Sequence, residues 1–222
     1  MSSSTEPIAD FFDRECCAAP GGAPVAGAAR GTAEMVLDAL TEKDLTGRSV
    51  LEIGSGDGSL SRALAARGAA SVSGLDLSPA SVEAARKARA EAAQPALLSY
   101  QVADAAEAPL AEFDIVLSEK VFCCYPQPGP LLANTLPAAR RLYVLVLPES
   151  RGVRGLLAKL AIAAENGLQR LRRDPFRAHV HDVRAIQATI EQAGFNLRAS
   201  ALHWAWLLLV FERADVSGQS PS

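Results

Sequence analysis

The sequence predicts an α/β domain in which a mainly parallel sheet lies between helices and ends in an antiparallel pair of strands. Short β-rich runs alternate with helical segments of about 10 to 15 residues, which is the pattern of βαβ units. Two central runs, DIVL and VLVL, are continuously apolar, as strands buried on both faces of a parallel sheet are. The last two β-rich runs follow one another with no helix between them, which indicates a hairpin at the sheet edge.

Length and charge limit what the chain can be. Its 222 residues favour one domain of ordinary α/β size. A net charge of −3 and an aromatic content of 5% give no support for a nucleic-acid partner. The longest apolar run, WAWLLLVF at 204–211, is far shorter than the roughly 20 residues that span a bilayer, and no signal peptide is visible. We therefore expect a cytoplasmic protein with reduced thiols and no membrane partner.

The first 30 residues are expected to form a lid. Residues 5–16 are predicted as a short helix with Thr5 as its N-cap. Residues 18–31 are small and rich in Gly and Pro, which indicates a flap. Residues 31–214 then form the main domain, and 215–222 are expected to be a disordered tail.

Each element of the main domain has a local signal. Ser78 followed by Pro79 marks the start of one helix, and Gly68 and Gly194 close two others. In chain order, the predicted strands are 49–53, 70–77, 97–104, 113–119, 142–149 and a hairpin over 196–213. The predicted helices are 32–40, 59–68, 78–93, 131–136, 153–172 and 183–194.

The helix predicted at 153–172 has an apolar face and a basic end. The apolar residues recur at helical spacing, at Leu157, Leu160, Ala161, Ala164, Leu168 and Leu171. We expect this helix to be a wall of the substrate site or a dimer surface. The basic side chains at its end are most simply solvated, because cations are favoured near a helix C-terminus. These basic residues are Arg170, Arg172, Arg173 and Arg177.

The stretch LEIGSGDGSL at 51–60 raises the question of what its glycine turn holds. Gly54, Gly56 and Gly58 let a strand turn tightly into a helix and let the backbone approach a ligand. Their spacing differs from the Gly-x-Gly-x-x-Gly of dinucleotide-binding proteins, and no Gly-Lys-Ser/Thr follows as it does in a phosphate loop. Two acids, Glu52 and Asp57, would repel a phosphate and attract a cation.

Further acidic residues indicate the chemistry of the rest of the ligand. Ligands of parallel α/β sheets bind beyond the carboxyl ends of the strands, so polar residues that follow strands are expected along one rim. Those residues are Glu52, Asp76, Asp104, Ser118 and Glu119. Asp76 is placed to accept hydrogen bonds from two ribose hydroxyls, and Asp104 from an adenine amino group. The ligand predicted by these acids is an adenosine with a cationic tail, which S-adenosylmethionine fits.

These motifs resemble those of class I S-adenosylmethionine-dependent methyltransferases. LEIGSGDGSL is similar to their first motif, GLDLS to their second-strand acidic motif, and VADAAEAPLAEFDIVLSEKVF to the stretch through their fourth strand. The resemblance covers about residues 31 to 213. It implies a Rossmann-like fold with a seven-stranded, mostly parallel sheet, helices on both faces and a C-terminal antiparallel hairpin. It also implies S-adenosylmethionine as the methyl donor and S-adenosylhomocysteine as a product.

The resemblance assigns a part of the cofactor to each matching residue. Gly54, Ser55 and Gly56 are expected under the methionine part, and Asp57 or Glu52 at its ammonium. Asp76 is expected at the ribose, and Leu77, Asp104 and Ala105 around the adenine. Ser118 is expected near the sulfonium.

The loop SEKVFCCYPQPGPLL after the fourth strand is expected to border the methyl donor and the acceptor. Methyltransferases similar to magnesium-protoporphyrin O-methyltransferase carry His-Tyr-Pro there, where this chain has Cys124-Tyr125-Pro126. The chain also resembles small bacterial methyltransferases with a Cys-Cys-Tyr-Pro loop. Tyr125 is a candidate to orient or deprotonate the acceptor, the alternative being a hydroxyl that is merely hydrogen-bonded. His181 is a candidate general base, although Asp182 beside it can cap a helix.

Four cysteines form two adjacent pairs, Cys16-Cys17 and Cys123-Cys124. This is the spacing neither of a disulfide framework nor of a zinc site, and nothing in the sequence requires a metal. The simplest interpretation is buried thiols that pack as small apolar groups. In the alternative, Cys124 and the other thiols converge under the flap to act in catalysis or to bind a soft metal or metalloid.

The predicted activity is methyl transfer to an oxygen or nitrogen of a small molecule in biosynthetic or secondary metabolism, by a chain that can form a homodimer. Two alternatives stay open. One is methylation of a thiol or metalloid with the help of the cysteine pairs. The other is a protein that binds the cofactor for a different reaction, such as a cyclisation.

Overall fold

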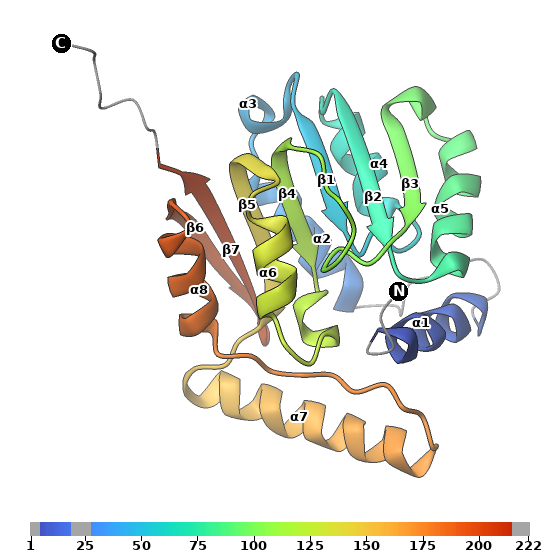
Figure 1. Cartoon of the computed structure of the whole chain (residues 1–222), viewed down its shortest axis with the longest axis vertical. Helices are drawn as coiled ribbons and strands as arrows, with labels where there is room; N and C mark the ends of the chain where they lie inside the picture. Colours follow the sequence, from blue (N-terminus) through green and yellow to red (C-terminus); the bar gives the residue numbers. More distant parts are fainter. Residues whose placement is uncertain (1–4, 19–27, 215–222) are drawn as a thin grey trace.

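The computed structural model describes residues 5–18 and 28–214, with the side chains of 15–18 and 28–30 left undescribed. The predictions for the flap at 19–27, for the tail and for the side chains of Cys16 and Cys17 therefore lie outside the described residues. The predicted fold class is confirmed: a seven-stranded sheet lies between two layers of helices (Figure 1).

The sheet has the strand order β3-β2-β1-β4-β5-β7-β6. All pairs from β3 to β5 are parallel, whereas β7 runs antiparallel to both β5 and β6. The predicted C-terminal hairpin is therefore confirmed. The strands are β1 (Ser49–Ile53), β2 (Ser71–Asp76), β3 (Leu98–Val102), β4 (Phe113–Glu119), β5 (Ala139–Pro148), β6 (Phe195–His203) and β7 (Trp206–Arg213).

The helices divide the core into two parts. One face of the sheet packs against α2, α3, α4 and α5, and the other packs against α6 and α8. The period of two along β5 sends Val144 to one part and Leu145 to the other. The helices are α1 (Glu6–Ala18), α2 (Ala28–Ala39), α3 (Glu42–Leu45), α4 (Ser59–Ala66), α5 (Pro79–Ala90), η1 (Pro95–Leu97), η2 (Phe122–Cys124), α6 (Gly129–Thr135), α7 (Gly152–Leu171) and α8 (Val183–Gln192).

Two helices lie beyond the carboxyl ends of the parallel strands. Figure 1 shows α1 and α7 together below the arrowheads of β1, β2 and β3. A strap, which we define as residues 172–182, leads from α7 to α8. Within the described ranges, no helix is both long enough and apolar enough to cross a membrane.

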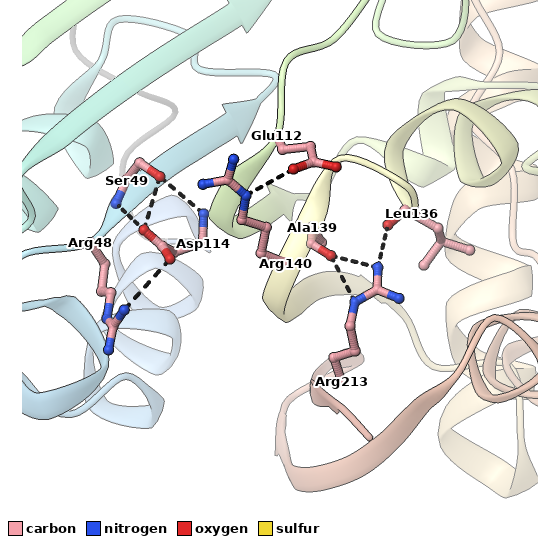
Figure 2. A network of polar contacts seen from close by, with 8 residues as sticks. All are labelled: Arg48, Ser49, Glu112, Asp114, Leu136, Ala139, Arg140 and Arg213. Carbon is pink, nitrogen blue, oxygen red and sulfur yellow. Dashed lines mark hydrogen bonds and ion pairs between the residues drawn. The ribbon is translucent and has the colours of Figure 1, made fainter. Parts of the chain in front are cut away.

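The opposite end of the sheet is tied together by the polar network in Figure 2. The carboxylate of Asp114 accepts hydrogen bonds from the Ser49 amide and hydroxyl, at 2.9 and 3.0 Å. Arg213 reaches from the end of β7 and donates to the Ala139 carbonyl at 2.6 and 3.1 Å. The amino ends of β1, β4 and β5 are thus fixed away from the edge that carries the candidate site.

Candidate functional site

The three glycines of the turn after β1 all have a left-handed backbone, with φ of 70°, 52° and 72° at Gly54, Gly56 and Gly58. Protein atoms fill the space beside two of them. A Cβ at Gly54 would lie 2.3 Å from the Val121 side chain, and one at Gly58 would lie 2.4 Å from the Tyr100 hydroxyl. A Cβ at Gly56 would meet nothing within 4 Å. Only this central glycine therefore borders open space that a ligand can enter.

Asp76, the last residue of β2, faces this turn. One of its carboxylate oxygens accepts the Gly56 amide at 2.8 Å, and the other accepts the Ser78 amide at 2.9 Å. Burial raises the pKa of Asp76 above its ordinary value, and the two amides partly oppose that rise. The bonds orient the carboxylate at the carboxyl edge of the sheet.

Glu52 lies deeper, in β1, and is 2% exposed. Its carboxyl accepts a hydrogen bond from the Ser61 hydroxyl on α4. Burial raises its pKa to about 8, and the nearby carboxylates of Glu119, Asp57 and Asp76 add to the rise. Glu52 is thus held protonated at neutral pH unless a cation enters beside it.

Asp57 is more accessible than Glu52 because it belongs to the glycine turn. One of its oxygens accepts the Ser59 amide at 3.0 Å, which stabilises the start of α4. The Arg62 guanidinium donates to its carbonyl at 2.7 Å. The expected ligands of an ammonium, Glu52 in β1 and Asp57 in the turn that follows, therefore lie close in sequence but at different depths.

The expected adenine side of the site is formed by the loop after β3. Asp104 is buried and accepts the Tyr125 hydroxyl at 2.9 Å on Oδ1, while its Oδ2 has no protein partner. Burial and the neighbouring Asp104 carboxylate raise the pKa of Tyr125 far above its ordinary value. Tyr125 therefore keeps its proton, donates a hydrogen bond to Asp104 and is not poised as a phenolate base. Leu77 and Ala105, the apolar residues expected beside the adenine, are buried in the same core cluster.

Two further buried oxygens near this edge lack a hydrogen-bond partner. They are the hydroxyls of Ser55, in the glycine turn, and of Ser118, in β4. A buried hydroxyl without a partner is costly, so such groups usually mark the place of a ligand or a water. The Ser55 hydroxyl packs against Gly74 of β2, whereas the Ser118 hydroxyl and Oδ2 of Asp104 are polar groups that a ligand at this edge could bind.

The loop after β4 begins in a strained conformation. Lys120 has a left-handed φ of 58°, which is uncommon outside glycine and is found at functional sites. Its carbonyl accepts the thiols of Cys123 at 3.2 Å and Cys124 at 3.6 Å. Both thiols are free and buried. The hydrogen bond to Cys123, followed by burial, raises the pKa of the Cys124 thiol, which disfavours a thiolate at Cys124.

The strap places two histidines beside the same loop. The His181 Nε2 lies 2.9 Å from the Phe122 carbonyl and 3.0 Å from the Tyr125 carbonyl. Both carbonyl oxygens can only accept hydrogen bonds, so this nitrogen carries a proton and donates to them. The His181 side chain thereby holds the loop in place. The His179 ring stacks on His181 with centroids 5.9 Å apart. Burial, and then the neighbouring His181, lowers the pKa of His179, which keeps that ring neutral near pH 7.

Helix α1, the predicted lid, contacts α5 and the strap through side chains that lack a local sequence signal. Asp13 accepts hydrogen bonds from the Ser78 hydroxyl and, at 3.0 Å, from the Ala80 amide at the start of α5. Arg14 forms an ion pair with Asp174 of the strap. Phe11 stacks on Phe176 with centroids 4.3 Å apart. The predicted lid is thus fastened to α5 on one side and to the strap on the other.

The described residues contain no group of three or more His, Cys, Asp or Glu side chains that could hold a metal ion. The candidate site is therefore a set of acids, hydroxyls and backbone amides around open space at Gly56.

Comparison with known proteins shows which domain and which fold this chain resembles. A family model described as a methyltransferase domain matches residues 51–140. The ubiquinone biosynthesis O-methyltransferase of Neisseria meningitidis is 37% identical over 92 residues, which are 40% of this chain and 38% of that protein. The ribosomal protein L11 methyltransferase of Escherichia coli is 33% identical over 61% of this chain and 42% of that protein. The chain thus matches only about two fifths of the length of these relatives.

Solved structures extend the likeness over nearly the whole fold. The magnesium protoporphyrin IX methyltransferase of Synechocystis PCC 6803, with S-adenosylhomocysteine bound, has a TM-score of 0.75 at 20% identity and covers 96% of this chain and 100% of that one. The geranyl diphosphate C-methyltransferase of Streptomyces coelicolor has a TM-score of 0.72 at 12% identity and covers 96% of this chain and 99% of that one. At these identities the likeness shows the fold.

Proposed function

We propose that this chain, which carries a class I S-adenosylmethionine-dependent methyltransferase domain, is an enzyme. It binds this cofactor at the glycine turn and methylates an oxygen or nitrogen of a small molecule. The observation that carries the proposal is the alignment of Gly56, Asp76 and Asp104 along one sheet edge. The open space at Gly56 lies beside the Asp76 carboxylate, and Asp104, beyond the end of the next strand β3, has an oxygen without a protein partner.

Each part of the cofactor has a complementary group. Asp76 would accept the ribose hydroxyls, and Oδ2 of Asp104 would accept the adenine amino group. Asp57 and Glu52 would face the ammonium, and the Ser118 hydroxyl would lie near the sulfonium. S-adenosylmethionine supplies an activated methyl group when bound. The chain's task is to hold the acceptor in line with that methyl, which lowers the entropic cost of the reaction.

The acceptor is proposed to lie between the loop after β4 and the strap. Apolar and aromatic groups line this region, among them Phe122 and Phe176. His179 is the best-suited group to take a proton from the acceptor, because its ring is neutral near pH 7 and half-buried. The predicted candidates His181 and Tyr125 are better suited to position the loop, because both use a ring nitrogen or hydroxyl as a donor to other protein groups.

The alternative of thiol or metalloid methylation gains little support from the described cysteines. Cys123 and Cys124 are buried, and both bond to the Lys120 carbonyl. The raised pKa of the Cys124 thiol disfavours the thiolate that nucleophilic attack or metal binding requires. The names of the similar proteins specify oxygen as the acceptor atom in one case and carbon in another. An oxygen or nitrogen acceptor is our own proposal for this chain.

Calorimetry with S-adenosylhomocysteine tests the cofactor site. Asp76→Asn should weaken binding about tenfold or more, because a charged acceptor of two hydroxyls is lost. The matched control is Asp114→Asn at the opposite end of the sheet, which also accepts a backbone amide and should leave the affinity unchanged. Equal effects of both variants, or no binding by the unaltered chain, would refute the cofactor assignment.

A second experiment separates methyl transfer from other uses of the cofactor. The chain is incubated with S-adenosylmethionine carrying a labelled methyl group and with panels of phenols, carboxylic acids and amines. Label in a product whose mass has risen by one methyl supports the proposal. Consumption of the cofactor without a methylated product would favour the non-methylating alternative.

A further inference from the structure

Helix α7 presents a large apolar face to the solvent. Six of the ten exposed large hydrophobic side chains of the described residues belong to this helix. Their exposed fractions are 75% for Val153, 57% for Leu156, 58% for Leu157, 59% for Leu160, 46% for Leu168 and 84% for Leu171. Such a concentration marks an interaction surface, because scattered single residues are the norm on soluble domains.

This face points away from the rest of the protein. The helix contacts the body of the molecule through a narrow stripe that recurs every three or four residues, at Gly155, Ala158, Ile162, Asn166 and Gln169. Asn166 fastens the stripe to the strap, since its side chain both donates to and accepts from the Ala178 backbone, at 2.8 and 2.9 Å. The leucines lie on the side opposite the stripe, so no described element of this chain covers them.

The charges of α7 indicate what covers this face. Residues 152–173 contain five basic side chains, Arg154, Lys159, Arg170, Arg172 and Arg173, and one acidic side chain, Glu165. All five basic residues are exposed. This local excess of positive charge stands out in a chain with a net charge of −3. Two copies of the helix packed on each other would bring cations against cations, whereas an anionic surface would be attracted.

An exposed tryptophan lies at the same edge. Trp204 is 84% exposed and has a left-handed φ of 55°, in the turn between β6 and β7. The neighbouring Ala205 carbonyl accepts the Glu149 amide at 2.7 Å, which places the turn beside the chain that leads into α7. Exposed tryptophans favour the boundary between water and lipid.

We propose that α7, with Trp204, binds the surface of an anionic lipid bilayer and lies in the plane of the headgroups. An amphipathic helix with leucines on one side and cations around them binds in this way without spanning the membrane. The expectation of no membrane partner was based on the absence of a spanning segment, which such a helix does not need. Because α7 lies beyond the carboxyl ends of the parallel strands (Figure 1), the bound protein would turn its candidate site toward the bilayer.

Vesicle flotation tests the proposal with the full chain and without methyl transfer. Vesicles of phosphatidylcholine alone are compared with vesicles of equal parts phosphatidylcholine and phosphatidylglycerol. We expect the chain to float with the anionic vesicles and to bind the neutral ones about tenfold or more weakly. The emission of Trp204 should shift to shorter wavelength on binding, and Trp204→Phe should remove that shift.

Paired variants separate the face from the rest of the surface. Leu157→Gln with Leu160→Gln, and separately Arg154→Gln with Arg172→Gln, should each lower the partition coefficient about tenfold or more. The matched controls, Leu197→Gln and Arg140→Gln, change an exposed leucine and an exposed arginine away from both α7 and Trp204 and should bind as the parent does. All of these positions are exposed, so folding should be retained, and calorimetry with S-adenosylhomocysteine checks the cofactor site independently.

Equal binding to both vesicle types, or none to either, would overturn the proposal. So would a dimer in light scattering that Leu157→Gln with Leu160→Gln converts to a monomer in the absence of lipid, because a second copy would then be the occupant of the face.

Discussion

The Tyr125 hydroxyl donates to Oδ1 of Asp104 at 2.9 Å and leaves Oδ2 of the same buried carboxylate without a protein partner. The two residues come from different crossovers of the sheet, so this bond links the loop after β4 to the loop after β3. It fixes the carboxylate in one orientation. The unpartnered oxygen is then available to a ligand that carries an N–H group, as adenine does.

Removing the Tyr125 hydroxyl should therefore weaken cofactor binding. Tyr125→Phe keeps the buried ring but loses the bond that orients Asp104, so the affinity for S-adenosylhomocysteine in calorimetry should fall about five- to tenfold. Tyr143→Phe is the control, because the Tyr143 hydroxyl is also buried but lies 2.8 Å from Thr135, away from the site. If Tyr143→Phe weakens binding as much, the effect belongs to general stability and not to Asp104.

The open space at Gly56 leads to a second prediction. Gly56→Ala should lower the cofactor affinity about tenfold or more, since a methyl group would enter the space assigned to the ligand. Gly47→Ala is a close match for its backbone cost, because Gly47 also has a positive φ, of 71°, and a Cβ there would likewise meet nothing within 4 Å. Both variants should lose a similar amount of thermal stability, about 1 kcal/mol. Loss of affinity in Gly47→Ala, or none in Gly56→Ala, would contradict the assignment.

The fold and the positions of the acids at the sheet edge could be predicted from the sequence because both depend on local patterns. The spacing of hydrophobic residues and the helix-capping residues predict the alternation of strands and helices. Ser78, for example, caps a helix by accepting a hydrogen bond from the Ser81 amide. Acids such as Asp76 could be placed because parallel strands end at a common edge. Which glycine borders open space could not be predicted, since Val121 and Tyr100 fill the other two positions from distant parts of the chain.

The contacts of α1 and the exposure of the apolar face of α7 could not be predicted from the sequence, for a related reason. Periodicity identifies which residues share a face of a helix but does not tell what covers that face, so Leu157 and Leu160 read equally well as buried or exposed. Asp13 and Ser78 are 65 residues apart, and a side chain that caps a distant helix leaves no local signal. Contacts of this kind are set by the tertiary fold.

If α1 acts as a lid, the aromatic contact between α1 and the strap should set how often it opens. Phe176→Ala would delete the buried ring on which Phe11 stacks, so local opening of α1 should become more frequent. Amide exchange in residues 8–14 should speed up about 100-fold, because the lost packing is comparable to that of other large-to-small core substitutions. The control, Phe195→Ala, removes a buried ring at the far strand β6. It should accelerate exchange through the whole domain, and an equally broad effect of Phe176→Ala would rule out a separate lid.

The raised pKa of Glu52 makes the stability of the free protein depend on pH. The folded protein keeps this carboxyl protonated up to about pH 8, whereas the unfolded chain ionises it near 4.5. Between these values the folded state binds the extra proton, so stability falls as pH rises, by up to about 1.4 kcal/mol per pH unit from this group. Glu52→Gln cannot ionise, so its stability relative to the parent should rise steadily from pH 5 to pH 8 in urea unfolding.

Ligand binding should weaken this pH dependence if Glu52 faces the ammonium of the cofactor. A cation beside the carboxyl favours the ionised form, so saturating S-adenosylhomocysteine should flatten the fall in stability between pH 5 and pH 8. Glu112→Gln is the control, because Glu112 is exposed and pairs with Arg140 at the other end of the sheet. The ligand should change the pH dependence of this variant as it changes that of the parent. A slope that the ligand leaves unchanged would instead assign the ammonium to Asp57 alone.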